Sequence, residues 1–165
     1  MNQEAAVRYS PEQGLFDLTL LNAEIKTATF EDVVIDGIQR GIPPELLTRL
    51  KQLWKTTKAI AGEVVAIGKI IVKQIFTFLQ ENPKLMIGIA VGAAISVLIA
   101  AIPFIGPILA PIALLVSTLY GAAMGAAMQE GDDSGSLYRA AIHLATKFFD
   151  LIKNIFNAIA QYWVQ

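Results

Sequence analysis

The chain of 165 residues lacks cysteine and holds a single histidine. The missing cysteines exclude disulfide bonds within the chain, cysteine-ligated zinc and thiol catalysis. The one histidine, His143, cannot form a histidine metal cluster within a single chain. Charged residues are also scarce, at 16% of the chain, whereas soluble domains average about 25%.

Motifs for catalysis and for nucleic-acid binding are missing as well. The chain has no glycine-rich phosphate loop and no nucleophile elbow, and Asp132 and Asp133 lack the ligand spacing of a calcium loop. Arg139 and His143 lie four residues apart, but without supporting residues they are interpreted as part of a solvated helix face. Trp54 alone does not supply the exposed aromatics of a nucleic-acid interface. We therefore expect no enzymatic activity, cofactor, metal or nucleic-acid partner.

Apolar residues are abundant instead, at 55% of the chain with a mean hydropathy of +0.54. This composition excludes disorder as the dominant state. No charge occurs between Leu85 and Met128, a run of 44 positions. A transmembrane helix needs roughly 20 residues, so this run is long enough for two.

The uncharged run is interrupted once, at residues 103–107, where Pro103, Gly106 and Pro107 break any continuous helix. We therefore predict an all-α membrane protein built around a transmembrane helical hairpin over residues 85–128. Its two spans are predicted at 85–102 and 108–128.

The expected orientation follows from the lysines and arginines that flank the hairpin. Lys69, Lys73 and Lys84 precede it, Arg139 and Lys147 follow it, and the turn is uncharged. This distribution predicts an integral membrane protein with both termini in the cytoplasm. The absence of a targeting sequence favours a bacterial inner membrane or a phage product. The acidic N-terminus and the position of the hairpin after residue 84 predict that it is not a cleaved signal peptide.

Small residues recur along both predicted spans. Gly88 and Gly92 form one GxxxG motif, and Gly121 and Gly125 form another. In lipid, such motifs let helix backbones approach closely, so we expect them to drive assembly of a homo-oligomer. The alternative is that they only pack the hairpin against itself.

Charge divides the rest of the chain into segments. Residues 1–42 carry seven acids and three bases, and are predicted to form a mainly helical acidic cap or docking segment that starts a helix at Thr29 and ends it at Gly41. Residues 43–84 carry three acids and seven bases, and are predicted to form one long basic amphipathic helix. Its basic stripe faces either anionic lipid headgroups, a protein partner or solvent. The stripe consists of Lys51, Lys55, Lys58, Lys69 and Lys73.

Residues 129–165 are predicted to form a short linker and a second amphipathic helix. Ser136 is the expected N-cap of this helix, and Trp163 near its end is expected at a membrane interface. Most of the circumference of both flanking helices is apolar and must be buried, against each other, the interface or further copies of the chain.

The order of a helix, an apolar hairpin and a helix is similar to the hydrophobic hairpin region of pore-forming colicins. The resemblance covers about the central third of the chain, is one of pattern, and implies no residue roles. Two flanking helices are expected to be too few to cover the hairpin, which favours permanent residence in the membrane.

Three functions fit these features. The first is a self-assembling protein that forms or gates a passage through the bilayer. The second is a non-conducting anchor or scaffold subunit that binds a protein partner through residues 1–80. The third is a bilayer-shaping hairpin, which spans of 18 and 21 residues disfavour because they are long enough to cross fully.

Overall fold

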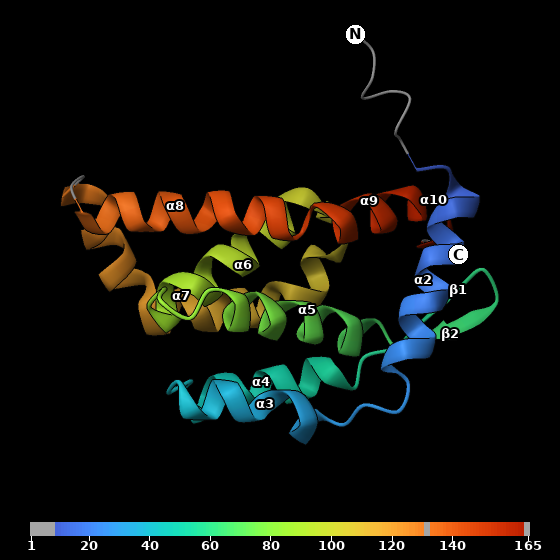
Figure 1. The fold of residues 1–165 in the computed structure, drawn as a ribbon, viewed down its shortest axis with the longest axis horizontal. Helices are drawn as coiled ribbons and strands as arrows, with labels where there is room; N and C mark the ends of the chain where they lie inside the picture. Colours follow the sequence, from blue (N-terminus) through green and yellow to red (C-terminus); the bar gives the residue numbers. More distant parts are fainter. Residues whose placement is uncertain (1–8, 131–132, 164–165) are drawn as a thin grey trace, which may run out of the picture.

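The computed structural model describes residues 9–130 and 133–163, most of them in helices (Figure 1). The all-α class predicted from the sequence is confirmed, with one small β-hairpin added within the described residues. In chain order the elements are α2 (Pro11–Ile25), α3 (Phe30–Gln39), α4 (Pro44–Trp54), β1 (Lys58–Ile60), β2 (Glu63–Val65), α5 (Ile67–Glu81), α6 (Ile87–Ala101), the 3₁₀ helix η1 (Pro103–Ile105), α7 (Gly106–Glu130), α8 (Asp133–Phe148), α9 (Asp150–Ala158) and α10 (Ala160–Trp163).

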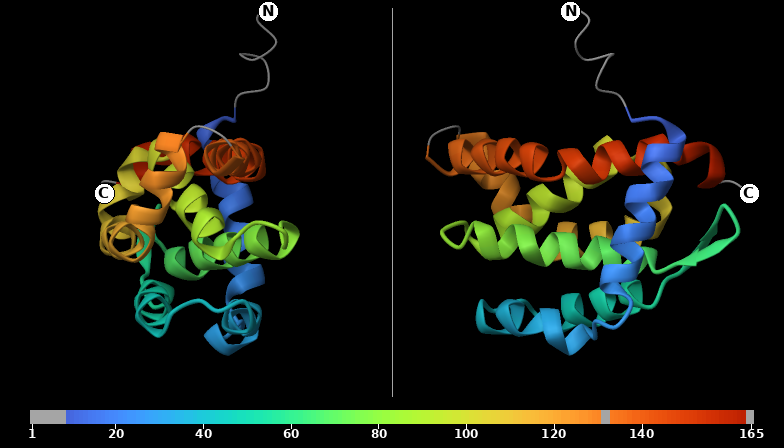
Figure 2. Two further views of the ribbon diagram at one scale, coloured as in Figure 1. Left: turned by 90° about the vertical axis from the view of Figure 1, so that its left-hand side faces the viewer. Right: turned by 45° about the vertical axis from the view of Figure 1, so that its right-hand side comes forward.

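The helices are stacked in layers around α6 (Figures 1 and 2). Helices α8, α9 and α10 follow one another along one side of the molecule, and α6 packs beneath α8. Helices α5 and α7 flank α6 on its other side, and α3 and α4 form the outermost layer beyond them. Helix α2 crosses one end of the stack and packs on α9 and α5. The buried apolar residues of these layers form one core.

The two N-terminal helices begin at side-chain caps. Ser10 Oγ accepts a hydrogen bond from the Gln13 amide at 3.1 Å at the start of α2. At the start of α3, the Thr29 amide donates to Asp32 Oδ2 at 2.9 Å, and the Asp32 amide donates to Thr29 Oγ1 at 3.3 Å. These hydrogen bonds with Thr29 hold the pKa of the Asp32 carboxyl below its ordinary value. The predicted start at Thr29 and end at Gly41, whose φ is +88°, are confirmed.

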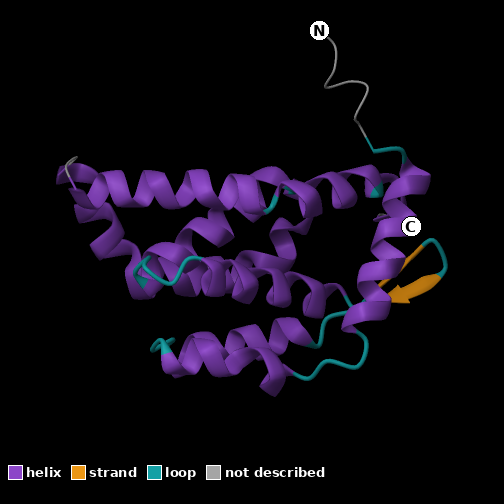
Figure 3. Cartoon of the chain, in the orientation of Figure 1, coloured by secondary structure: helices purple, strands orange, loops and turns teal. Residues whose placement is uncertain are grey.

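The prediction of one continuous basic helix over residues 43–84 is wrong. Helix α4 ends at Trp54, and residues 58–65 form the antiparallel hairpin β1–β2 before α5 begins (Figure 3). The turn residues Ala61 and Gly62 have φ angles of +52° and +85°, which is the pattern of the two-residue turns that join β-strands. Valine, isoleucine and threonine around this turn favour strands over helix because their branched side chains fit a pleated backbone.

The two helices that replace the predicted single helix meet at Gly68. Its amide donates to the Thr56 carbonyl oxygen at 2.9 Å, and a Cβ at this position would lie 1.6 Å from the carbonyl oxygen of Leu53. Only glycine fits so close to another backbone. Because α5 packs beside α4 instead of extending it, their lysines do not form one stripe.

The predicted C-terminal amphipathic helix is present as three successive helices, α8, α9 and α10. They are interrupted at the buried residues Phe149 and Ile159. Ser136 is not the N-cap, because α8 already begins at Asp133. The partner of this segment is now defined, since α8 packs on α6 and α7 while α9 packs on α2.

Candidate functional site

The uncharged stretch folds as a helical hairpin of α6 and α7. Helix α6 ends at Ala101, because Ile102, which precedes Pro103, leaves the helical conformation with φ −131° and ψ 76°. The 3₁₀ helix η1 then leads directly into α7, so the turn is shorter than predicted. Pro103 opens η1, whereas Gly106 and Pro107 already belong to the first turn of α7.

Helix α6 lies at the centre of the core. Of its 15 residues, nine are buried beneath α5, α7 and α8. Such a helix rises roughly 22 Å, which is less than the thickness of about 30 Å of the hydrocarbon core. The expectation that the flanking helices cannot cover the hairpin is therefore wrong for its first helix, because α8 and α5 cover it.

Helix α7 carries the same type of residues on the outside of the molecule. Within the described residues, Pro103–Gly121 is the one stretch that is long and apolar enough to cross a membrane, by length and composition alone. Only 22% of an 18-residue window in this stretch is buried, and Leu114 is 72% exposed. Across residues 106–121 of α7, the exposed residues lie on one face of the helix, here called the α7 ridge, and none of them is charged. The ridge consists of Pro107, Ala110, Pro111, Leu114, Ser117 and Thr118.

Polar side chains from outside the hairpin hold both ends of α6. The half-buried Arg40 guanidinium donates to the carbonyl oxygens of Leu79 in α5 and of Leu85, the latter at 3.0 Å. At the other end, the side-chain amide of Asn157 in α9 donates to the carbonyl oxygen of Ala101 at 3.0 Å. The carbonyl groups of Leu79 and Ala101 lie in the last turns of α5 and α6, where carbonyl groups lack intrahelical partners, whereas Leu85 lies in the loop just before α6.

The turn of the hairpin is held by aromatic packing. Phe104 in η1 packs against Trp163 with ring centroids 5.0 Å apart, and Lys58 Nζ lies 5.1 Å from the centroid of the same indole. Trp163 is only 9% exposed. The residue expected at a membrane interface therefore connects the C-terminal helices to the hairpin turn in this structure.

The glycines predicted to mediate oligomerisation include three that lie between the helices of the hairpin. A Cβ on Gly88 would lie 2.6 Å from Cδ1 of Tyr120. Gly92 and Gly121 line one groove between α6 and α7, with a volume of about 240 Å³. The packing of Gly125 lies outside the described part of α7. Gly88 therefore lets the two helices of one chain approach closely, and contact between copies stays a prediction.

The five lysines of the predicted stripe lie in several separate places. Lys51 and Lys55 are exposed on α4, and Lys58 lies over Trp163. Lys69 Nζ donates to the carbonyl oxygens of Lys26 and Ala28, both at 3.0 Å.

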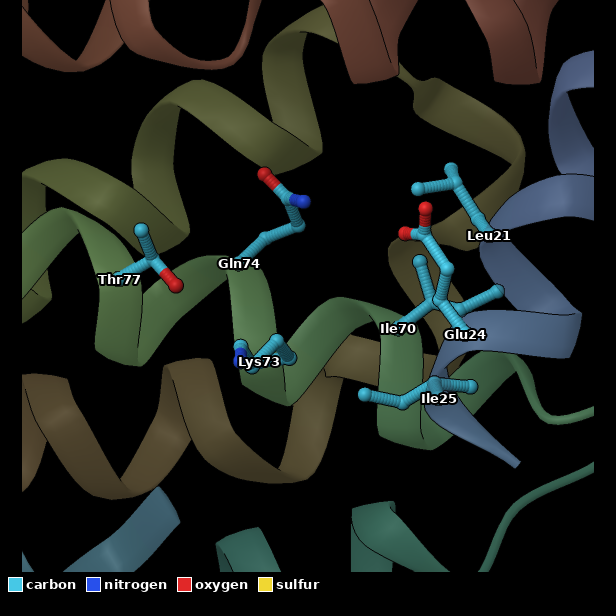
Figure 4. Close-up of a pocket in the computed structure, with 7 residues that line it drawn as sticks. All are labelled: Leu21, Glu24, Ile25, Ile70, Lys73, Gln74 and Thr77. Atoms are coloured by element: carbon cyan, nitrogen blue, oxygen red, sulfur yellow. The ribbon is translucent and has the colours of Figure 1, made fainter. Parts of the chain in front are cut away.

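The fifth lysine, Lys73, lies on α5 at a pocket between α5 and α2. This pocket has a volume of about 170 Å³, and Figure 4 shows Glu24 of α2 across from α5. Lys73 and Glu24 form no ion pair within 4.0 Å among the described residues. Gln74 and Thr77 complete the polar side of the pocket.

Important contacts involve residues outside the predicted sites. Arg40 lies between the end of α3 and Gly41. This position gives no sequence signal for a contact with Leu85, 45 residues away. Asn157 is exposed on α9, and its partner Ala101 lies 56 residues away in the chain. Across residues 9–130 and 133–163, no three histidine, aspartate or glutamate side chains are placed to share a metal ion. The chain matches no protein-family model, no curated protein and no solved structure.

Proposed function

We propose that the protein is a non-enzymatic membrane protein that places the α6–α7 hairpin in a bilayer and self-assembles to form or gate a passage. The observation that carries the proposal is the uncharged, exposed α7 ridge. Exposed apolar side chains such as Leu114, which is 72% exposed, are unfavourable in water, and grouped apolar side chains are typical of sites that meet lipid or protein. No aspartate, glutamate, lysine or arginine occurs in the chain between Leu85 and Met128.

The proposal gives different roles to the two helices. Helix α7 reaches lipid directly through its ridge, whereas α6 must leave its place between α5 and α8. Leaving requires that the contacts of Arg40 with Leu85 and of Asn157 with Ala101 be broken. The arrangement described above is then the closed form, and the inserted hairpin is the open form. Both termini stay on the cytoplasmic side, as the distribution of lysine and arginine predicts.

Assembly is proposed at the groove between α6 and α7. Besides Gly92 and Gly121, this groove is lined by Ser96 and Ser117, whose side chains lie at the surface. Small residues allow the close approach of a helix from another copy. The serine hydroxyls are polar groups that could line a passage, in a hairpin with no charged residue.

Insertion can be tested with single-cysteine variants, because the native chain contains no cysteine. An environment-sensitive fluorophore on Leu114→Cys should shift to shorter wavelength with vesicles and be quenched by lipids that carry a quencher in the acyl chain. The same fluorophore on Phe16→Cys provides a matched control, because Phe16 is also exposed, at 60%, but lies on α2. Equal quenching at the two positions, or none at Leu114→Cys, would refute insertion through α7.

The passage is tested by release of a trapped dye from the same vesicles. A pore that assembles should give leakage that rises steeply with the number of proteins per vesicle. Disulfide cross-linking of Ser117→Cys should then yield dimers in vesicles. Insertion without leakage or cross-linking would contradict the passage.

The alternative function is a non-conducting anchor or scaffold subunit. It is favoured by exposed apolar residues on α2 and α3, in the segment expected to dock a partner. These are Phe16, Leu20, Ile35 and Ile38, with exposures between 48% and 60%. Tight vesicles that nevertheless contain inserted protein would support this alternative.

A further inference from the structure

Basic side chains of α4 lie beside the part of the molecule that is proposed to enter lipid. Helix α4 packs against α7. Arg49 and Lys51 are exposed on α4, and Lys55 is exposed at the residue that caps its end. None of the three forms a hydrogen bond, ion pair or ring contact with the described residues. Lys58 and Lys69 differ, because each is engaged with a ring or a backbone carbonyl group.

A groove runs between α4 and α7, with a volume of about 140 Å³. Its two walls differ in chemistry. The wall formed by α4 and the residues after it presents Arg49, Gln52 and Thr56 beside the apolar Leu53, whereas the α7 wall presents only Ile108, Pro111 and Ile112. Pro111 also belongs to the α7 ridge, so the apolar wall is continuous with the surface proposed to enter the bilayer.

We propose that this groove binds an anionic phospholipid, with the lipid phosphate at Arg49 and an acyl chain along the α7 wall. A guanidinium can bind two phosphate oxygens at once, and the Gln52 amide can donate a further hydrogen bond. The apolar wall suits hydrocarbon, which a water-soluble anion lacks. The inference rests on the proposed function, because the acyl chain can reach this wall only if α7 lies at the bilayer.

The balance of charge on α4 favours an anionic surface as the occupant. Against three cations, the helix carries one acid, Glu45, which lies one turn before Arg49 and is also exposed. Lysines and arginines close to a bilayer are attracted by anionic lipids. The proposed site therefore sets both the type of lipid and the depth of insertion, because α4 would lie at the headgroups while the α7 ridge lies below them.

The proposal is tested by flotation of the full chain with vesicles of neutral phosphatidylcholine or of phosphatidylcholine mixed with phosphatidylglycerol. The double variant Arg49→Gln/Lys55→Gln should weaken binding to the anionic vesicles by about tenfold or more. The matched control is Lys26→Gln/Lys73→Gln, which removes the same charge from exposed positions on or next to α2 and α5. It should bind like the unmodified chain, and circular dichroism should show that both variants are folded.

Arg49→Lys separates a defined phosphate site from general attraction of charge. It keeps the charge but loses the planar guanidinium, and should bind anionic vesicles several-fold more weakly than the unmodified chain. Equal loss of binding to anionic vesicles in the two double variants would overturn the proposal, since the position of the cations would then not matter. Quenching at Leu114→Cys in neutral and anionic vesicles alike would overturn the lipid site and leave the proposed insertion standing. Absence of binding to either vesicle would refute both.

Discussion

Helices α6 and α7 are alike in composition and opposite in environment. Both are uncharged over residues 87–121, and both were predicted to span a membrane. Yet nine of the 15 residues of α6 are buried inside the bundle, whereas the 18-residue window on the α7 side of the turn is only 22% buried. The hairpin therefore joins a core helix to a surface helix.

The difference shows that lack of charge has two physical explanations. In α6 it is explained by the protein core, because a charged side chain there would be removed from water without a partner. In α7 the core explains only the buried face, and leaves the uncharged α7 ridge without an explanation. The proposed insertion therefore depends on α7, and α6 follows it only if the contacts at its ends open.

The largest expected effect comes from placing a carboxylate in each helix. Ala93 is fully buried in α6, so Ala93→Asp should cost about 4 kcal/mol or more of the free energy of unfolding. Leu114→Asp on the α7 ridge should change it by about 0.5 kcal/mol or less. Urea unfolding followed by circular dichroism measures both. Similar losses in the two variants would show that α7 is buried in solution, for example in an oligomer.

Arg40→Met tests the restraint at the beginning of α6. The variant keeps a long side chain but leaves the carbonyl oxygens of Leu79 and Leu85 without their charged donor, and should cost about 3 kcal/mol. Because the restraint opposes release of α6, insertion into vesicles should also become faster. Arg49→Met is the control for stability, since Arg49 is exposed and its side chain forms no hydrogen bond or ion pair with the described residues. Equal stability of the two variants would refute the restraint.

Gly88→Ala tests the contact between the two helices. The added Cβ would lie 2.6 Å from the ring of Tyr120, so the hairpin must open slightly, at a cost of about 2 kcal/mol. Gly106→Ala is the matched control, because no atom beyond its neighbours in the chain lies within 4 Å of its added Cβ and its φ of −49° is helical. Because Gly106 is helical and precedes Pro107, whose ring crowds an added Cβ, this control should change the free energy of unfolding by roughly 0.5 kcal/mol or less. A destabilised Gly106→Ala, or an unaffected Gly88→Ala, would contradict the close packing at Gly88.

The sequence was sufficient where a local pattern determines the structure. The capping residues at Thr29 and the proline that ends α6 act within a few residues, so both helix boundaries were predictable. The β-hairpin was missed because an apolar spacing typical of a helix continues through it, although Gly62 and its branched neighbours contained the signal. The close approach of Gly68 to Leu53 depends on tertiary packing, which spacing along the chain does not contain.

The candidate site was predictable in part for the same reason. The uncharged run located the hairpin, but composition cannot distinguish a helix surrounded by protein from one that faces outward. The contacts of Arg40 and Asn157 join residues 45 and 56 positions apart. The cations of α4 were visible as charge, yet their position beside α7 depends on the β-hairpin that turns the chain back.

The variant with the smallest expected effect, Thr29→Ala, tests whether the release of α6 depends on Arg40 or only on the overall stability of the fold. Thr29→Ala removes the cap of α3 and should cost about 1 kcal/mol, without changing any contact at the ends of α6. Because the pKa of Asp32 is lowered in the folded protein, the contribution of this carboxylate is complete above its unfolded pKa of about 4. It is lost as the pH falls through the lower folded value. The difference in stability between Asp32→Asn and the unmodified chain should therefore shrink below pH 4, as urea unfolding at several pH values can measure. If Thr29→Ala accelerates insertion as much as Arg40→Met does, the rate of insertion depends on overall stability, and the hydrogen bonds of Arg40 do not specifically restrain α6.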